Sequence, residues 1–336
     1  MSKSALLSSA TFGGNRVQSE GPAYALRIQC PVCSHPLPTS GSHVSIGPAC
    51  PECGFVISNV NGIFRCLPPD RELYFRQFIR EYELVRTQEG RGSPCPDYYL
   101  ELPFKDLTSR NRWQWRIRAK TWRHIARYLL PEIERTYPGG CDVLDVGAGN
   151  CWLSYRMALR GHRPVAVDLL DNDADGLGAA QHYLPGLLRP FLRFQAEMDR
   201  LPLAPDQFDV VIFNASFHYS VDYERTLAEA LRCLRRPGHV IIADSPFYSS
   251  HENGQKMVAE KRAAFEQRFG FRSDSVQSHE YLTPEILRGL KEKLGLRLKI
   301  LKPWYGINWS LRPAKARLLR RREPAKFYLL WAKVNN

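Results

Sequence analysis

The chain has 336 residues, 44% of them apolar, so it can bury one core of ordinary size and a smaller module. This composition excludes a disordered or low-complexity chain. Lysine and arginine outnumber aspartate and glutamate by 47 to 34, and the net charge of +13 favours anionic partners. No apolar run reaches the roughly 20 residues that cross a bilayer, and the run Ala5 to Leu7 is too short for a signal-peptide core. We therefore expect a cytoplasmic protein without a transmembrane segment.

The sequence pattern of the first 68 residues predicts a flexible leader over residues 1–25 and a zinc ribbon over residues 26–68. Two Cys-x-x-Cys pairs, Cys30 with Cys33 and Cys50 with Cys53, are separated by 16 residues. Four thiolates complete the tetrahedral shell of a structural zinc ion, whose binding stabilises a module too short to fold by burial alone. A redox dithiol or unliganded cysteines are the alternatives. Three further residues lie close enough in sequence to replace the fourth ligand: His35, His43 and Cys66.

Residues 69–138 predict a helical connector that also serves as a substrate region. Helical patterns run from Arg71 to Arg86 and from Arg110 to Leu130, with a loop rich in glycine and proline between them. Five basic residues share one face of the second helix: Arg112, Arg116, Lys120, Arg123 and Arg127. This face either follows nucleic-acid phosphates while Trp113 stacks on a base, or is simply solvated.

Residues 139–336 predict an α/β domain with a doubly wound, Rossmann-like sheet. Short apolar runs alternate with helical segments, which is typical of a parallel sheet covered on both faces. The expected strands are Val143 to Val146, Pro164 to Asp168, Phe191 to Phe194, Val210 to Phe213, Val240 to Ala243, Leu296 to Leu301 and Phe327 to Val334. The expected helices are Cys151 to Arg160, Asp222 to Leu234, Glu252 to Phe269 and Pro284 to Leu294, the last capped by Thr283.

A glycine turn follows the first of these strands. Gly147 and Gly149 allow a tight turn and a close approach of the backbone to a ligand, and Asp168 ends the next strand, where an acid can accept ribose hydroxyl protons. A dinucleotide fingerprint requires a small residue where Trp152 stands, so the turn disfavours a dehydrogenase. The alternative is an inactive domain in which the glycines only shape the turn.

From residue 139 to about 245 the chain resembles the class I S-adenosylmethionine-dependent methyltransferases, in particular those of type 11. The resemblance implies that Asp145, Gly147, Gly149 and Asp168 bind the cofactor, with Cys151 in place of a common third glycine. It also implies that Glu197 and Met198 lie beside the adenine. The stretch from Cys30 to Pro68 is similar to the amino-terminal zinc ribbon of several bacterial methyltransferases, including the rRNA guanine N1 family, whose final ligand is usually histidine where this chain has Cys53.

The loop after the fourth strand is the best candidate for the acceptor side of the reaction. Asn214 is expected to contact the cofactor or to orient an acceptor, His218 has the pKa of a general base, and Tyr219 is placed to assist. In the alternative reading His218 caps a turn and Tyr219 packs in the core. An aromatic insert over residues 246–310 either covers a flat or lipophilic acceptor or packs on the sheet.

These features predict methyl transfer from S-adenosylmethionine to a small or lipophilic acceptor. Positioning of the two reactants supplies much of the rate, about 7 to 11 kcal/mol, so a general base is optional. Two other functions stay open. The basic faces and the ribbon favour methylation of an rRNA or tRNA base, and a domain without turnover would leave a zinc-dependent binding protein.

Overall fold

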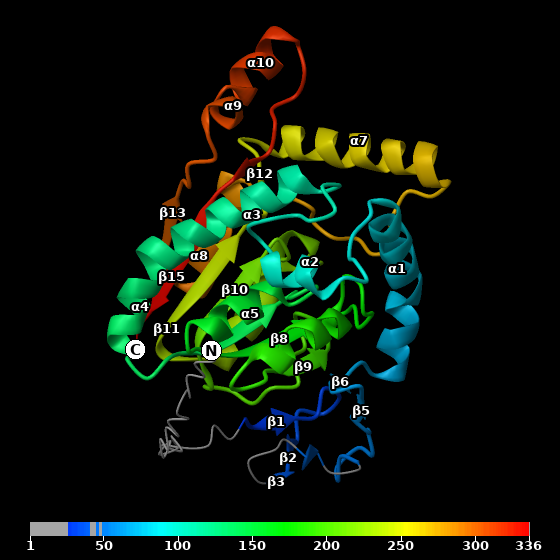
Figure 1. Cartoon of the computed structure of the whole chain (residues 1–336), viewed down its shortest axis with the longest axis vertical. Coiled ribbons are helices and arrows are strands. Elements are labelled where there is room, and N and C mark those ends of the chain that lie inside the picture. Colours follow the sequence, from blue (N-terminus) through cyan, green and yellow to red (C-terminus); the bar gives the residue numbers. More distant parts are fainter. Residues whose placement is uncertain (1–25, 41–44, 47–48, 336) are drawn as a thin grey trace, which may run out of the picture.

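The computed structural model describes residues 26–40, 45–46 and 49–335, and its centre is a nine-stranded sheet (Figure 1). The expected leader, residues 1–25, and His43 lie outside this part. From one edge to the other the sheet contains β13 (Leu298–Leu301), β15 (Leu329–Val334), β11 (Leu234–Ala243), β10 (Phe208–Asn214), β7 (Asp142–Val146), β8 (Arg163–Asp168), β9 (Leu192–Gln195), β6 (Ile63–Arg65) and β5 (Ser58–Val60).

The middle of the sheet is parallel and its two margins are antiparallel. Strands β11, β10, β7, β8, β9 and β6 run parallel to their neighbours, whereas β15 and β13 at one edge and β5 at the other are antiparallel. The chain proceeds from β7 to β8 and β9 on one side and from β10 to β11 on the other. The strand order therefore reverses between β7 and β10, which is where ligands bind in open α/β sheets.

Helices cover both faces of the sheet, as the alternating pattern predicted (Figure 1). Successive residues of β10 belong to opposite cores: Val211 and Phe213 pack on one side, Val210 and Ile212 on the other. The first side is covered by α6 (Tyr223–Cys233) and α8 (Pro284–Leu294). The second is covered by α2 (Pro96–Glu101), α3 (Arg112–His124), α4 (Leu130–Thr136) and α5 (Trp152–Leu159).

The expected strands and helices of the α/β domain are all present. The Thr283 hydroxyl accepts a hydrogen bond from the Ile286 N–H, so it caps α8 as the sequence predicted. Pro131 does not end the helix that begins at α3, because a π-helical turn over Ile125–Leu129 joins α3 to α4. Between β8 and β9 the crossover contains only short 3₁₀ segments, Leu177–His182 and Leu184–Gly186.

The amino-terminal module is attached directly to the sheet. Two short hairpins, β1 (Ile28–Gln29) with β2 (Pro36–Leu37) and β3 (Thr39–Ser40) with β4 (Ser45–Ile46), precede β5 and β6. Strand β6 then pairs with β9, and the Cys66 N–H donates to the Gln195 carbonyl at 2.9 Å. Helix α1 (Pro69–Gln88) follows immediately, so the module leads straight to the carboxyl edge of the sheet.

The carboxyl-terminal third adds an outer layer and a protrusion. Helix α7 (His251–Phe269) crosses above the sheet, and β12 (Pro246–Phe247) pairs with β14 (Lys326–Phe327) beneath it. Helices α9 (Ile307–Ser310) and α10 (Arg312–Leu318) stand away from the rest of the molecule at the top of Figure 1. Among the described residues, no helix has the length and apolar character needed to span a bilayer.

Candidate functional site

The glycine turn between β7 and α5 forms one wall of the candidate site. Gly147 and Gly149 have φ values of +73° and +52°, which favour glycine, and Cys151 follows at +63°. A Cβ on Gly147 would lie 2.2 Å from the Cβ of Ser216, so the turn and the loop after β10 are in close contact. The backbone at Gly147 is therefore exposed to a ligand without an intervening side chain.

Asp168 is held against this turn by backbone donors. One carboxylate oxygen accepts the Gly149 N–H at 2.7 Å and the other accepts the Leu170 N–H at 2.8 Å. Burial raises the pKa of Asp168, and these N–H groups oppose that shift. Each carboxylate oxygen keeps lone pairs for further donors, such as the two hydroxyls of a ribose.

A cavity of about 470 Å³ opens at the carboxyl ends of β7, β8 and β10. This volume is typical of a pocket for a small molecule. Six residues predicted from the sequence line it: Gly147, Gly149, Asp168, Glu197, Met198 and Asn214. Tyr219 lines it as well. Asp145 does not, because it lies buried behind the turn and accepts a hydrogen bond from the Ser154 hydroxyl at 2.7 Å.

Glu197 is paired with a residue that the sequence analysis left in the connector. Arg71 of α1 donates to the two carboxylate oxygens of Glu197 at 2.9 and 2.7 Å. The Glu197 side chain is 6% exposed, so this bidentate pair compensates a buried charge. Helix α1 thus closes the cavity on the side where the family resemblance places the adenine.

Asn214, at the end of β10, is the least satisfied polar side chain in the cavity. It is 8% exposed, and its amide makes no hydrogen bond of normal geometry, although it lies close enough to Asp244 to lower the pKa of that carboxyl. Buried amides are nearly always paired in folded proteins. Ala215 follows with φ +56°, and Asp244, at the end of the neighbouring strand β11, has φ +53°. Strain of this kind is concentrated at functional sites.

A second cavity, of about 390 Å³, adjoins the first. The residues that line both are Phe78, Tyr82, Arg86, Arg118, Ala215, Tyr219 and Val276. His218 lines only the second cavity. Its Nδ1 lies 3.4 Å from the Ser245 hydroxyl, and burial lowers its pKa to about 4, so the imidazole is neutral at physiological pH. The structure thus places His218 at the second cavity and Tyr219 at both cavities.

Two arginines line one wall of the second cavity. The Arg91 side chain is 2% exposed; its Nε pairs with Glu89 at 3.2 Å, and its Nη1 has no hydrogen-bond partner. Arg118 lies over the Trp115 ring at 4.7 Å, and no carboxylate of the described residues lies within 4 Å of it. Burial and the nearby Arg91 and Arg86 lower the pKa of Arg118 to about 10. An anionic or strongly accepting group would be stabilised here.

Much of this site was not recognised from the sequence. Helix α1 contributes Tyr82 and Arg86 in addition to Arg71, and Arg86 donates to Asp175 at 2.6 Å. The helix was predicted, but its position across the cavity was not. One sequence signal could have indicated a basic residue at this site: Asp175, an acidic residue in the long connection between β8 and β9, is the partner of Arg86.

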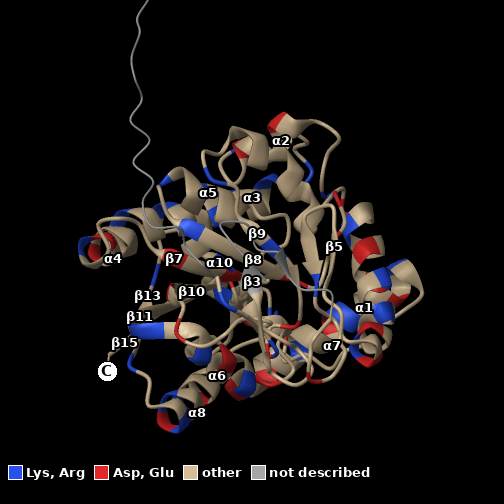
Figure 2. Ribbon diagram, turned by 90° about the horizontal axis from the view of Figure 1, so that it is seen from below, with Lys and Arg blue, Asp and Glu red and all other residues tan. Residues whose placement is uncertain are grey.

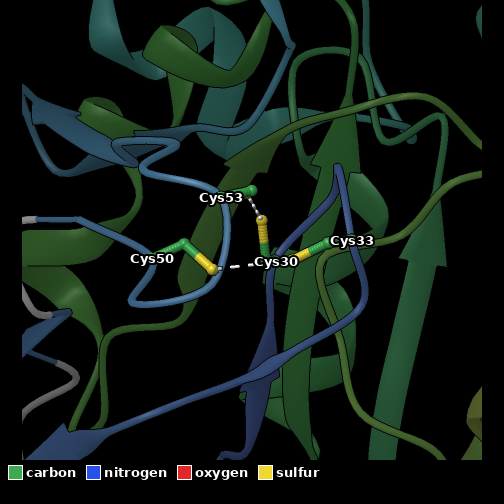
Figure 3. Close-up of side chains that lie close together, drawn as sticks. All are labelled: Cys30, Cys33, Cys50 and Cys53. Carbon is green, nitrogen blue, oxygen red and sulfur yellow. Dashed lines mark hydrogen bonds between the residues drawn. The ribbon is translucent and has the colours of Figure 1, made fainter.

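The four cysteines of the amino-terminal module converge on one point (Figure 3). Their sulfur atoms all lie within 4.8 Å of one another, with Cys30 3.5 Å from Cys53 and Cys33 3.6 Å from Cys50. This arrangement fits a tetrahedral zinc ion with four thiolate ligands. Within the described residues, no other group of three or more His, Cys, Asp and Glu side chains is arranged to hold a metal. His35 is not in the cluster, and the Cys66 thiol donates to the Phe64 carbonyl instead.

The fold and the site define a Rossmann-like domain that binds its ligand at the point where the strand order reverses. Residues 144–242 match the family described as "Methyltransferase domain". The chain therefore carries a methyltransferase domain, and its likeness to the class I S-adenosylmethionine-dependent methyltransferases is confirmed.

Three curated relatives are similar to a part of the chain. A phthiotriol/phenolphthiotriol dimycocerosates methyltransferase of Mycobacterium leprae is 36% identical over 107 residues, which are 31% of this chain and 38% of that protein. A demethylmenaquinone methyltransferase of Mycobacterium marinum is 30% identical over 123 residues, 37% of this chain and 47% of that protein. The third, a malonyl-[acyl-carrier protein] O-methyltransferase of Buchnera aphidicola, is 25% identical over 127 residues, 37% of this chain and 47% of that protein. The chain thus spans less than half of each relative's length.

Solved structures with a similar arrangement include a putative methyltransferase from Bacillus halodurans, with 16% identity and a TM-score of 0.42. The matched region covers 62% of this chain and 99% of that one. A possible histamine N-methyltransferase from Thermotoga maritima has 16% identity and a TM-score of 0.40, over 78% of this chain and 99% of that one.

Proposed function

We propose that this protein transfers a methyl group from S-adenosylmethionine to a small or lipophilic acceptor. The observation that carries the proposal is the first cavity, where Gly147, Asp168 and the buried Asn214 amide meet at the carboxyl edge of the sheet. These groups offer the cofactor a close backbone approach, an acceptor for hydroxyls and a donor–acceptor amide.

The residues of the first cavity have distinct roles toward the cofactor. Asp168 accepts hydrogen bonds from the ribose hydroxyls, and Gly147 and Gly149 let the cofactor lie directly over the backbone of the turn. Glu197 and Met198 flank the adenine, with the Glu197 carboxylate fixed by Arg71. When bound, S-adenosylmethionine supplies an already activated methyl group, so the protein mainly excludes water and aligns the acceptor. Asp145 supports the turn from behind through Ser154.

The second cavity is the acceptor site in this proposal. Aromatic side chains that include Phe78, Tyr82 and Phe265 suit a flat or lipophilic molecule, and Arg91 with Arg118 suits a polar oxygen or an acidic group on it. Two relatives are named for lipophilic acceptors, a phthiotriol dimycocerosate and demethylmenaquinone. His218 accepts the acceptor's proton, and Tyr219, which lines both cavities, orients the acceptor.

The four cysteines hold a structural zinc ion in this proposal. A closed thiolate shell leaves no position for a reacting water molecule, so the metal stabilises the module and takes no part in methyl transfer. All nine cysteines lie in the described part, and none forms a disulfide. Reduced thiols are typical of the cytoplasm, where we place the protein.

Replacing His218 by alanine is expected to lower kcat at least about 100-fold while leaving cofactor affinity unchanged, since general bases contribute on that scale. Because only the neutral imidazole accepts a proton and its pKa is about 4, wild-type activity should be flat from pH 8 to about 5.5 and fall below about 5. Initial rates across this pH range, with calorimetric titration of the cofactor, check both points. Near-normal turnover of the variant would assign His218 to the turn alone.

The function is tested with tritiated S-adenosylmethionine and three acceptor pools: a lipid extract, a polar small-molecule extract and total RNA. Label in either of the first two supports the proposal. Label confined to RNA would favour base methylation, the alternative suggested by the exposed arginines of α3, such as Arg112 and Arg116. An intact protein that binds neither S-adenosylmethionine nor its demethylated product would be a zinc-dependent binding protein instead.

A further inference from the structure

The segment that protrudes from the molecule has an unusual charge pattern. From Lys302 to Arg322 the sequence contains seven basic residues and no acidic one. A second acid-free basic run, from Arg110 to Arg127, lies mainly on α3. Other helices carry both signs: seen from below, α1 and α8 have basic and acidic residues side by side (Figure 2). We define the arm as residues 304–321, which include α9 and α10. Among the described residues, no carboxylate lies within 4 Å of its five basic side chains: Arg312, Lys315, Arg317, Arg320 and Arg321.

The arm also exposes large apolar side chains. Trp304 is 65% exposed, Ile307 68%, Leu311 57%, Leu318 84% and Leu319 48%. Single exposed apolar residues are common on protein surfaces, but five within sixteen residues of one protrusion indicate an interaction surface. The part of the chain that the structure describes places nothing over them.

Apolar residues and Lys315 share one side of the helical part of the arm. Backbone hydrogen bonds run from the Leu311 N–H to the Ile307 carbonyl, from Lys315 to Leu311 and from Leu319 to Lys315. Steps of four residues keep these side chains on one side of a helical segment. Arg317 and Arg320 are exposed on other sides of the same short segment. Apolar side chains bordered by arginine and lysine are typical of segments that lie in the interface of a bilayer.

The base of the arm lies at the rim of the second cavity. Trp309 of α9 contacts the Trp113 ring at 5.5 Å and stacks on the Phe327 ring at 5.3 Å. Both Trp113 and Phe327 line the second cavity. The guanidinium of Arg312 covers the Trp309 ring at 3.8 Å, which fixes this junction. The arm is therefore joined to the wall of the second cavity through Trp113 and Phe327.

We infer that the arm docks on the surface of an anionic phospholipid bilayer. The apolar side chains enter the boundary between headgroups and acyl chains, and the basic side chains contact lipid phosphates. RNA offers the same phosphates, but it gives exposed isoleucine and leucine nothing to bury in, so the bilayer is the better fit. This inference goes beyond the proposed function, because vesicle binding is measured without catalysis.

Flotation of the full-length zinc-loaded protein with lipid vesicles tests the inference. We expect the protein to float with vesicles of phosphatidylcholine containing 30% phosphatidylglycerol and to float weakly with phosphatidylcholine alone, and salt should release it. The triple variant K315Q, R317Q and R320Q should lower the partition coefficient about 100-fold, at about fivefold per charge. The triple variant I307S, L311S and L318S should lower it at least tenfold.

A charge-matched control separates the arm from the general basicity of the chain. Arg76, Arg80 and Arg288 are exposed and form no salt bridge in the described structure. The triple variant R76Q, R80Q and R288Q should float as the wild type does. Equal loss in the control and the arm variants would overturn the inference. So would the absence of wild-type flotation, whether or not the arm variants lose binding to a tRNA pool.

Discussion

Replacement of Asp168 by alanine is expected to weaken the binding of S-adenosylmethionine at least about 100-fold. Asp168 is the last residue of β8, and the N–H groups of Gly149 and Leu170 orient its carboxylate. Two hydroxyl groups donating to a charged acceptor contribute roughly 1.5 to 3 kcal/mol each. Calorimetric titration with S-adenosylmethionine and with its demethylated product measures the loss.

The conservative and neighbouring variants show whether the carboxylate acts directly. Asp168→Asn keeps the shape and one acceptor oxygen, so about one third to one half of the lost binding energy should return. Asp171→Asn is the matched control, because Asp171 lies three residues away and pairs with Arg65 at the surface. Affinity lost equally in Asp171→Asn, or retained in Asp168→Ala, would refute the assignment of Asp168 to the ribose.

Removal of the zinc ion is expected to lower the melting temperature by at least about 10 °C. Metal binding to four thiolates supplies folding free energy that the short strands β1 to β4 cannot obtain from burial. Cofactor affinity should also fall, about tenfold, because β6 connects the module to α1, whose Arg71 holds Glu197 at the first cavity. Metal analysis, thermal melting and calorimetric titration of Cys50→Ser measure these effects.

The exposed cysteine outside the cluster provides the control. Cys95, at the start of α2, is free and exposed, so Cys95→Ser should retain one zinc ion per chain and the wild-type melting temperature. A wild-type protein without zinc would contradict the proposed site. A Cys50→Ser protein that melts as the wild type does would show that the cluster does not stabilise the chain.

The elements that the sequence predicted best are those with strong local signals. Strands β8, β10 and β11 each contain an unbroken apolar run, and the turn after β7 contains glycines at positive φ, so both were readable from residues close together in sequence. Thr283 followed by Pro284 likewise predicted the start of α8. The same reasoning singled out Gly147, Gly149 and Asp168, which line one cavity in the structure.

Features that depend on distant parts of the chain were not predictable in this way. Strand β6 has three residues, and its partner β9 lies about 130 residues later, so no local pattern reveals the pairing. The position of α1 over the cavity follows from that pairing, and with it the roles of Arg71 and Tyr82. Asp145 illustrates the reverse case, since its place in a motif did not reveal that its side chain points behind the turn.

The pairing of β6 with β9 also has a consequence for how the chain folds. Until the amino-terminal module docks, the parallel sheet ends at β9 with a row of unpaired backbone groups, and such an open edge invites pairing with other chains. The module emerges from the ribosome first but must wait for some 130 residues before its partner strand exists, which raises the contact order and slows folding. The amino-terminal module thus pairs with β9 and protects a sheet edge that would otherwise pair with other chains. We expect variants that lack this module to aggregate during synthesis.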